Sequence, residues 1–245
     1  MRWRIGWIHN NGERICILTG TDSFYLTNIV PAPKMNKYER RDRMRVKMCG
    51  MKTTAAARAA EEAGADYVGF IFAKNSRRYV APEAAREIVR TLGCVKKVGV
   101  FVDMPMDEVN EIAAHVGLDY VQLHGHETSE MARMAERPVI KAYRYGDDFD
   151  ADEANAYPAE MILVDSFVQG TAGGTGTRFH WQEAAQEIVR VRKPVLIAGG
   201  MTAENVGKAV EIFHPFGVDV SGGIEEDGEK SAVKIRAFME TVQRI

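Results

Sequence analysis

Hydrophobic and polar positions alternate between two patterns from residue 45 to the end of the chain. Short apolar runs rich in β-branched residues predict strands that are buried on both faces. Between them lie Ala- and Glu-rich stretches whose apolar residues recur at helical spacing. The expected strands lie at 45–49, 66–72, 97–102, 120–124, 139–143, 161–165, 195–199 and 218–221. The expected helices lie at 55–64, 82–93, 106–117, 128–135, 148–157, 181–190, 202–213 and 231–245, and the fifth has the weakest pattern.

This order of elements predicts an α/β protein. Parallel neighbouring strands need a crossover connection, and each expected strand is followed by an expected helix. An open, doubly wound sheet could be built from the same order. Eight units in roughly 200 residues favour a closed (β/α)₈ TIM barrel.

Residues 1–43 follow neither pattern and are expected to form an irregular extension. They carry a net charge of +4, and the remaining residues carry a net charge of −6. Met44 lies where the regular pattern begins, so two interpretations stay open. Either the true start is Met44, or a loosely ordered extension precedes a catalytic barrel domain at 44–245.

Composition narrows the class of protein. The net charge of −2 gives no indication of nucleic acid or of an anionic membrane as a partner. No apolar run is long enough to predict a membrane-spanning helix. The three cysteines are widely spaced, with no cluster of metal-binding spacing. We therefore expect a cytoplasmic, reduced protein without a metal site, and we expect it to be a monomer or homodimer.

Candidate chemistry collects where the expected strands end, because the active site of a (β/α)₈ barrel lies at that face. Gly199 and Gly200 follow one strand, and Ser221, Gly222 and Gly223 follow the next. Glycines allow backbone N–H groups to approach an anion closely, so we expect these two loops to bind phosphate rather than only to turn. A third Gly-rich stretch, at 170–176, is either a mobile lid or only a long connection.

Two side chains at these ends could transfer protons. Cys49 is either a small buried apolar residue or a base whose thiol pKa is lowered. Asp165 ends an apolar strand, so it is either a structural acceptor or a catalytic acid. Arg78 could clamp a carboxylate or phosphate, or be a solvated loop charge. Gln122 and His124 are expected to support the site without contacting the reacting atoms.

Seven segments together resemble the phosphoribosylanthranilate isomerase family. They are KMCGMK (47–52), GADYVGFIFAKNSRRYV (64–80), KVGVFVD (97–103), YVQLHG (120–125), VDSF with GGTGTRFHW (164–181), LIAGGMTAENV (196–206) and VDVSGGIE (218–225). They follow the family's order across nearly all of residues 44–245. The resemblance implies a TIM barrel of the ribulose-phosphate-binding type. It also implies an Amadori rearrangement of a small phosphorylated substrate, N-(5′-phosphoribosyl)anthranilate, in tryptophan biosynthesis, without a metal or an organic cofactor.

The resemblance also implies residue roles. Cys49 would be the general base, Asp165 the general acid, and Arg78 the group that holds the anthranilate carboxylate. The phosphate would lie on Gly199, Gly200, Ser221, Gly222 and Gly223. The sequence departs from the family's pattern at His180, Gly222, Ser231 and Lys52.

Rival functions fit the strand ends less well. An indole-glycerol-phosphate synthase would need a catalytic lysine and glutamate, and a ProFAR-type isomerase would need an aspartate where this chain has Cys49. A phosphate-binding barrel without catalytic activity would not require both Cys49 and Asp165.

Overall fold

The computed structural model describes residues 3–10, 13–20, 43–146, 149–165 and 181–245. The chain divides into two compact units, Met1–Arg43 and Met44–Ile245. No helix in these ranges is both long and apolar enough to cross a membrane.

The first unit contains a two-stranded antiparallel sheet, β1 (Trp3–Asn10) and β2 (Glu13–Gly20), with Asn10 opposite Glu13. The expectation of an irregular segment is thus corrected for these residues. Asn11 and Gly12 connect the strands in the sequence, and Asn-Gly is a dipeptide strongly favoured in hairpin connections. Apolar residues at adjacent positions, such as Trp7 and Ile8, hide the strand period in the sequence.

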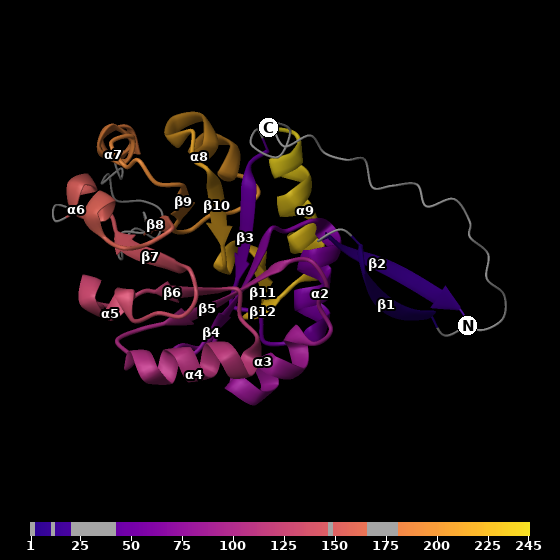
Figure 1. Cartoon of the computed structure of the whole chain (residues 1–245). Helices are drawn as coiled ribbons and strands as arrows, with labels where there is room; N and C mark the ends of the chain where they lie inside the picture. Colours follow the sequence, from indigo (N-terminus) through magenta and orange to yellow (C-terminus); the bar gives the residue numbers. More distant parts are fainter. Residues whose placement is uncertain (1–2, 11–12, 21–42, 147–148, 166–180) are drawn as a thin grey trace. The chain divides into compact units, whose positions relative to one another are not determined.

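Eight parallel strands of the second unit close into a barrel, as predicted (Figure 1). The last strand pairs with the first, with Val218 opposite Val46. The strands are β3 (Arg45–Cys49), β4 (Tyr67–Ile71), β5 (Lys96–Phe101), β6 (Tyr120–Leu123), β7 (Val139–Arg144), β8 (Met161–Asp165), β9 (Val195–Ala198) and β10 (Gly217–Val220).

Helices surround the strands (Figure 1). They are α2 (Thr54–Ala63), α3 (Pro82–Val89), α4 (Met106–Val116), α5 (Ser129–Arg133), α6 (Ala151–Ala156), α7 (Trp181–Ile188), α8 (Val206–Phe213) and α9 (Ala232–Gln243). All eight predicted helices are present. The shortest is α5, although the weakest pattern belongs to α6.

Local signals explain where several helices begin and end. The Thr53 side chain accepts a hydrogen bond from the N–H of Ala56, and Gly64 at φ 95° ends α2. Pro82 begins α3 as expected, but this helix ends at Val89 rather than near Gly93. The N–H of Gly93 instead binds the carboxylate of Glu61 on α2, at 2.8 Å. In a longer α3 this N–H would bond within the helix. Its hydrogen bond to a different helix therefore accounts for the earlier end of α3.

The fold buries two groups of side chains. The larger group packs between the strands and the surrounding helices. The smaller fills the inside of the barrel and consists of Tyr67, Val98, Ile140, Ala142, Met161, Leu163, Leu196 and Ala198. Four polar side chains in the described residues, Lys47, Gln122, Glu127 and Lys141, are also almost wholly buried. Because successive strand residues face opposite sides, Lys47 and Cys49 face the same side of β3.

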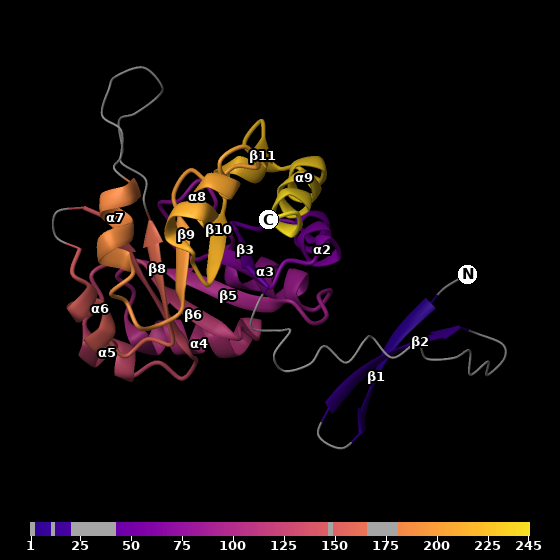
Figure 2. The ribbon, with the colours of Figure 1, turned by 90° about the horizontal axis from the view of Figure 1, so that it is seen from above.

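The loop after β10 contains the short helix η1 (Gly222–Ile224) and a small hairpin, β11 (Glu225–Glu226) with β12 (Glu229–Lys230). Figure 2 shows β11 beside α9, in the loop that follows β10. This loop begins where the last strand of the barrel ends.

Candidate active site

Cys49 and Asp165 both occupy the final position of their strands, β3 and β8. In the closed order of strands, β10 and β9 lie between β3 and β8. Cys49 is buried, and Asp165 is partly buried. The structure therefore places both residues at the carboxyl end of the barrel, the face that carries the active site in this fold.

Cys49 lies against Gly69 on the neighbouring strand. The two residues are directly opposite each other, and a Cβ atom at Gly69 would come within 2.7 Å of the Cys49 Sγ. Gly69 therefore makes the space that the thiol occupies. The sequence analysis did not single out this glycine.

Burial and the neighbouring positive charges have opposite effects on the pKa of the Cys49 thiol. Burial raises the pKa of the Cys49 thiol, whereas the positive charges of Lys47 and Lys230 lower it. Burial has the largest effect, so the thiol is mainly protonated near neutral pH. This differs from the lowered pKa expected for a base, and it makes the nearby cations important for forming a thiolate.

Lys47 forms a buried ion pair beneath the site. Its Nζ lies 2.7 Å from Asp219 Oδ1, and Asp219 is opposite Lys47 in the pairing of β10 with β3. Burial alone would lower the pKa of Lys47, but the charges of Asp219 and Cys49 outweigh burial and raise it. Lys47 is therefore an ammonium ion held beside Cys49. Asp219 was not identified from the sequence as a partner of this lysine.

Gln122 and His124 lie together at the end of β6. The Gln122 Nε2 is 2.8 Å from the His124 Nδ1, within hydrogen-bond distance. Burial lowers the pKa of His124, while the charge of Asp165 opposes this effect. A neutral imidazole follows. The Gln122 Oε1 is buried without a hydrogen-bond partner in the described ranges.

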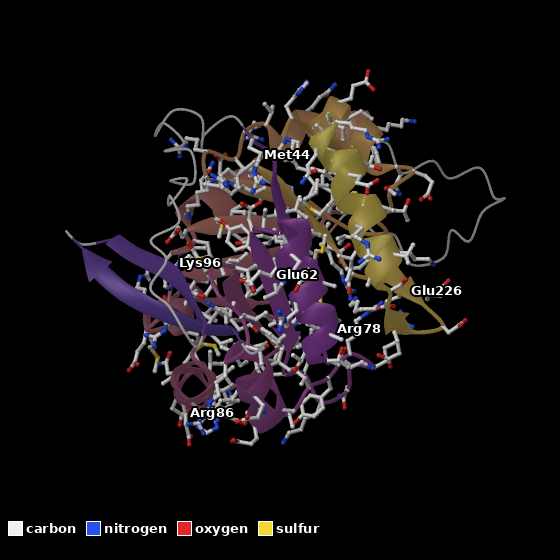
Figure 3. The ribbon with its side chains drawn as sticks, turned by 90° about the vertical axis from the view of Figure 1, so that its right-hand side faces the viewer. Met44, Glu62, Arg78, Arg86, Lys96 and Glu226 are labelled. Carbon is white, nitrogen blue, oxygen red and sulfur yellow. The ribbon has the colours of Figure 1, made fainter. Side chains whose placement is uncertain are left out.

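Arg78 comes from the loop after β4 and approaches the loop after β10 (Figure 3). Its Nε and Nη2 donate to the two carboxylate oxygens of Glu225, at 2.5 and 3.0 Å. This pair raises the pKa of Arg78. Arg78 is therefore not the solvated charge of the simpler interpretation. Glu225 was missed as a partner, although it ends the quoted segment VDVSGGIE.

The predicted phosphate-binding loops after β9 and β10 contact each other. Gly199 and Gly200 have φ of 97° and 62°, which glycine adopts without strain. A Cβ atom at Gly223 would clash with the carbonyl oxygen of Met201 in the other loop. The Ser221 hydroxyl donates to the Cys49 carbonyl at 3.0 Å, which joins the second loop to β3.

Some departures from the family's pattern have structural partners. A Cβ atom at Gly222 would meet Arg78 Nη2 at 3.5 Å, an ordinary contact, so the position has room for a side chain. Ser231 caps the first turn of α9, and Lys52 forms an ion pair with Glu229 at 2.7 Å. His180 and the candidate lid at 170–176 lie outside the described residues. Within the described ranges, no three His, Cys, Asp or Glu side chains are grouped to hold a metal ion.

The chain is similar to one family over nearly all of the barrel. Residues 46–241 match the model described as N-(5′-phosphoribosyl)anthranilate isomerase. A relative from Desulforamulus reducens with that name is 44% identical over 203 residues, which cover 82% of this chain and 96% of the relative.

Solved structures agree with this similarity. A phosphoribosylanthranilate isomerase from Thermotoga maritima, described as monomers generated from a dimeric enzyme, superposes with a TM-score of 0.72 at 35% identity. A phosphoribosylanthranilate isomerase in complex with reduced 1-(o-carboxyphenylamino)-1-deoxyribulose 5-phosphate has the same TM-score and identity. Each comparison covers 82% of this chain and 100% of the other. The predicted fold and family are confirmed: the chain belongs to the N-(5′-phosphoribosyl)anthranilate isomerase family.

Proposed function

We propose that this isomerase converts N-(5′-phosphoribosyl)anthranilate into 1-(2-carboxyphenylamino)-1-deoxyribulose 5-phosphate, with Cys49 as general base and Asp165 as general acid. Membership of the family supports the reaction, which belongs to tryptophan biosynthesis and is an isomerisation of the aldose–ketose type. The observation that carries the assignment of residues is the position of both side chains at the carboxyl ends of β3 and β8.

The proton transfers follow from these positions. Asp165 donates a proton to the furanose oxygen, so the ring opens and the anilino nitrogen forms a Schiff base with C1′. The Cys49 thiolate then removes the proton from C2′, which gives an enolamine. Tautomerisation to the ketone completes the isomerisation, and no atom is gained or lost. Each acid or base step of this kind typically accelerates a reaction by about 10² to 10⁴.

The neighbouring groups fit these roles. The ammonium of Lys47, held by Asp219, stabilises the negative charge that Cys49 must carry as a base. His124 is neutral and lies within electrostatic reach of Asp165, while its hydrogen bond with Gln122 holds the imidazole in place. These contacts support the prediction that Gln122 and His124 orient the site without taking part in bond breaking.

Substrate binding is divided between two regions of the face. Arg78 binds the anthranilate carboxylate through its planar guanidinium group. The phosphate binds to backbone N–H groups of the loops that contain Gly199, Gly200, Ser221, Gly222 and Gly223. These loops adjoin Cys49 through the Ser221 hydroxyl, so a substrate held there would extend over the thiol.

Turnover by wild-type protein, Cys49→Ala and Asp165→Asn tests the proposal. The fluorescence of the substrate should fall with time for the wild type, and kcat should drop by at least about 10² for each variant. Cys94→Ala is the control, because Cys94 is an exposed cysteine and should leave the rate unchanged. Folded wild-type protein without turnover would contradict the reaction. A folded Cys49→Ala or Asp165→Asn variant with full activity would contradict that residue's role.

Two further properties belong to the proposal. We expect the protein to be a monomer or homodimer and to work in the cytoplasm, where cysteines stay reduced. Light scattering coupled to size exclusion would distinguish a monomer from a dimer.

A further inference from the structure

Arg78, the proposed ligand of the substrate carboxylate, already binds a carboxylate of the protein. Two of its nitrogens, Nε and Nη2, face the two oxygens of Glu225. The Nη1 of Arg78 makes no hydrogen bond to the described part of the chain. A two-point contact of this kind fixes the plane of a guanidinium group.

Glu225 is the centre of a cluster of cations. Its Oε1 also accepts from Lys230 Nζ at 2.8 Å, and its Oε2 accepts from Arg77 Nη2 at 2.9 Å. The side chains of Glu225 and Lys230 are 7% and 4% exposed, whereas that of Arg77 is 66% exposed. One anion among three cations leaves a net charge of +2 at the edge of the site. This charge suits a substrate that carries both a carboxylate and a phosphate.

The cluster joins the two regions that the substrate must bridge. Glu225 directly follows η1, in the loop proposed to bind phosphate. Lys230 also donates to the Ser221 carbonyl at 2.9 Å, which secures the same loop. On the other side, a Cβ atom at Gly50 would come within 2.7 Å of Arg78 Cδ, so Arg78 lies across the residue after Cys49. Glu225 therefore fixes Arg78 relative to the phosphate loop and the thiol.

We propose that Glu225 is a positioning residue that makes the site selective for a substrate with a carboxylate, because it holds Arg78 with Nη1 free for that carboxylate. This inference rests on the proposed function. The opposing interpretation is that Glu225 occupies the place of the substrate carboxylate and competes with it. The two interpretations predict opposite effects of removing the charge of Glu225.

A pair of ligands separates these interpretations. One is the reduced product, 1-(2-carboxyphenylamino)-1-deoxyribitol 5-phosphate, and the other is the same compound made from aniline, without the carboxylate. The dissociation constant of the aniline compound divided by that of the carboxylate compound is a ratio that measures how much the carboxylate contributes to affinity. In Glu225→Gln this ratio should fall by about tenfold or more, since a charge-assisted hydrogen bond loses its fixed geometry. Affinity for the aniline compound should change less than the ratio does.

Glu229→Gln is a matched control. Glu229 belongs to the same hairpin but pairs with Lys52 rather than with Arg78. The ratio of dissociation constants for Glu229→Gln should therefore equal that of the wild type. In turnover, Glu225→Gln should raise KM more than it lowers kcat. Melting temperatures of all variants verify that folded proteins are compared.

Each result has a definite meaning. A ratio that falls in Glu225→Gln but not in Glu229→Gln supports the positioning role. A ratio that is unchanged or higher in Glu225→Gln overturns it, and a higher ratio identifies Glu225 as a competitor. Failure of the proposed function looks different, because the folded wild type would then not turn over the substrate, whatever the ratio of dissociation constants.

Discussion

At the scale of single residues, the catalytic thiol depends on charges that the strands bring beside it. The thiol pKa is raised by burial and by Asp219, and lowered by Lys47 and Lys230. Arg78 is also close enough to interact with the charge of Cys49. Among the groups that lower the thiol pKa, Lys47 has the largest effect, so it should control how readily the thiolate forms.

Lys47→Met should therefore raise the thiol pKa further. A thiolate base is active above its pKa, so kcat/KM rises with pH, and the variant's rise should lie at higher pH than the wild type's. A shift of one pKa unit would reduce the rate near neutral pH by about tenfold. The pH profile of kcat/KM, together with the rate of Cys49 alkylation followed by mass spectrometry, measures the shift.

Asp219→Asn should shift the thiol pKa in the opposite direction to Lys47→Met. The charge of Asp219 raises the thiol pKa, so its removal should move the rise in kcat/KM to lower pH. If both variants lose activity equally at every pH, the ion pair only supports the structure, and its proposed control of the thiol is wrong.

Glu225 gives a prediction on stability. Burial would raise the pKa of Glu225, but hydrogen bonds from Arg78 and Lys230 outweigh burial and lower it to about 2. A carboxyl with a depressed pKa in the folded state stabilises the fold above its ordinary pKa, and this stability disappears as the pH falls toward 2. The contribution is on the order of 3 kcal/mol at neutral pH. Urea unfolding of wild type and Glu225→Gln should differ most near neutral pH and converge in acid. A constant difference at all pH values would count against this linkage.

At the scale of elements, the loops after β9 and β10 depend on one close contact. Gly223 packs against the backbone carbonyl of Met201, which cannot move aside as a flexible side chain would. Gly223→Ala should therefore push the loops apart and weaken phosphate binding by about tenfold or more, about the effect of losing one charge-assisted hydrogen bond. Competitive inhibition of turnover by inorganic phosphate measures this affinity.

The adjacent glycine is the control for that experiment. A Cβ atom at Gly222 would meet only the end of the Arg78 side chain, at an ordinary distance. Gly222→Ala should thus bind phosphate within about threefold of the wild type, since the backbone donors remain in place. Equal losses in both variants would mean that the phosphate does not depend on the contact between the loops.

The elements of the barrel could be predicted because burial makes most positions of each strand apolar, even where one polar residue, such as Lys47 in β3 or Gln122 in β6, interrupts the run. The strand ends, and with them Cys49 and Asp165, followed from that pattern. The end of α3 did not follow, because it depends on the bond between Gly93 and Glu61 across the helix interface. Side-chain pairs such as Arg78 with Glu225 were also missed. These two residues are 147 positions apart, and the local pattern of apolar and polar residues does not indicate which distant residues are in contact.

At the scale of the whole molecule, the barrel is a complete unit from its first strand. Arg45 donates its N–H to the Phe216 carbonyl at 3.1 Å, and its Nη1 donates to Asp66 at 2.9 Å. Met44 packs against the buried core. The contacts that close the barrel between β10 and β3 thus begin at residue 45, and the family model matches from residue 46.

Removal of residues 1–43 should therefore leave a folded, active isomerase. A protein that begins at Met44 keeps β3, Cys49 and the pairing that closes the barrel, so its kcat/KM should stay within about twofold of the full chain, as expected when a domain has its own core. A shorter variant that begins at Lys52 loses the first strand and Cys49, and it should not fold, because the barrel then has two open edges. Circular dichroism and turnover of both variants check these outcomes. If the variant that begins at Met44 were folded but much less active, residues 1–43 would contribute to activity. The segment would then be neither a dispensable extension nor the result of a mis-assigned start.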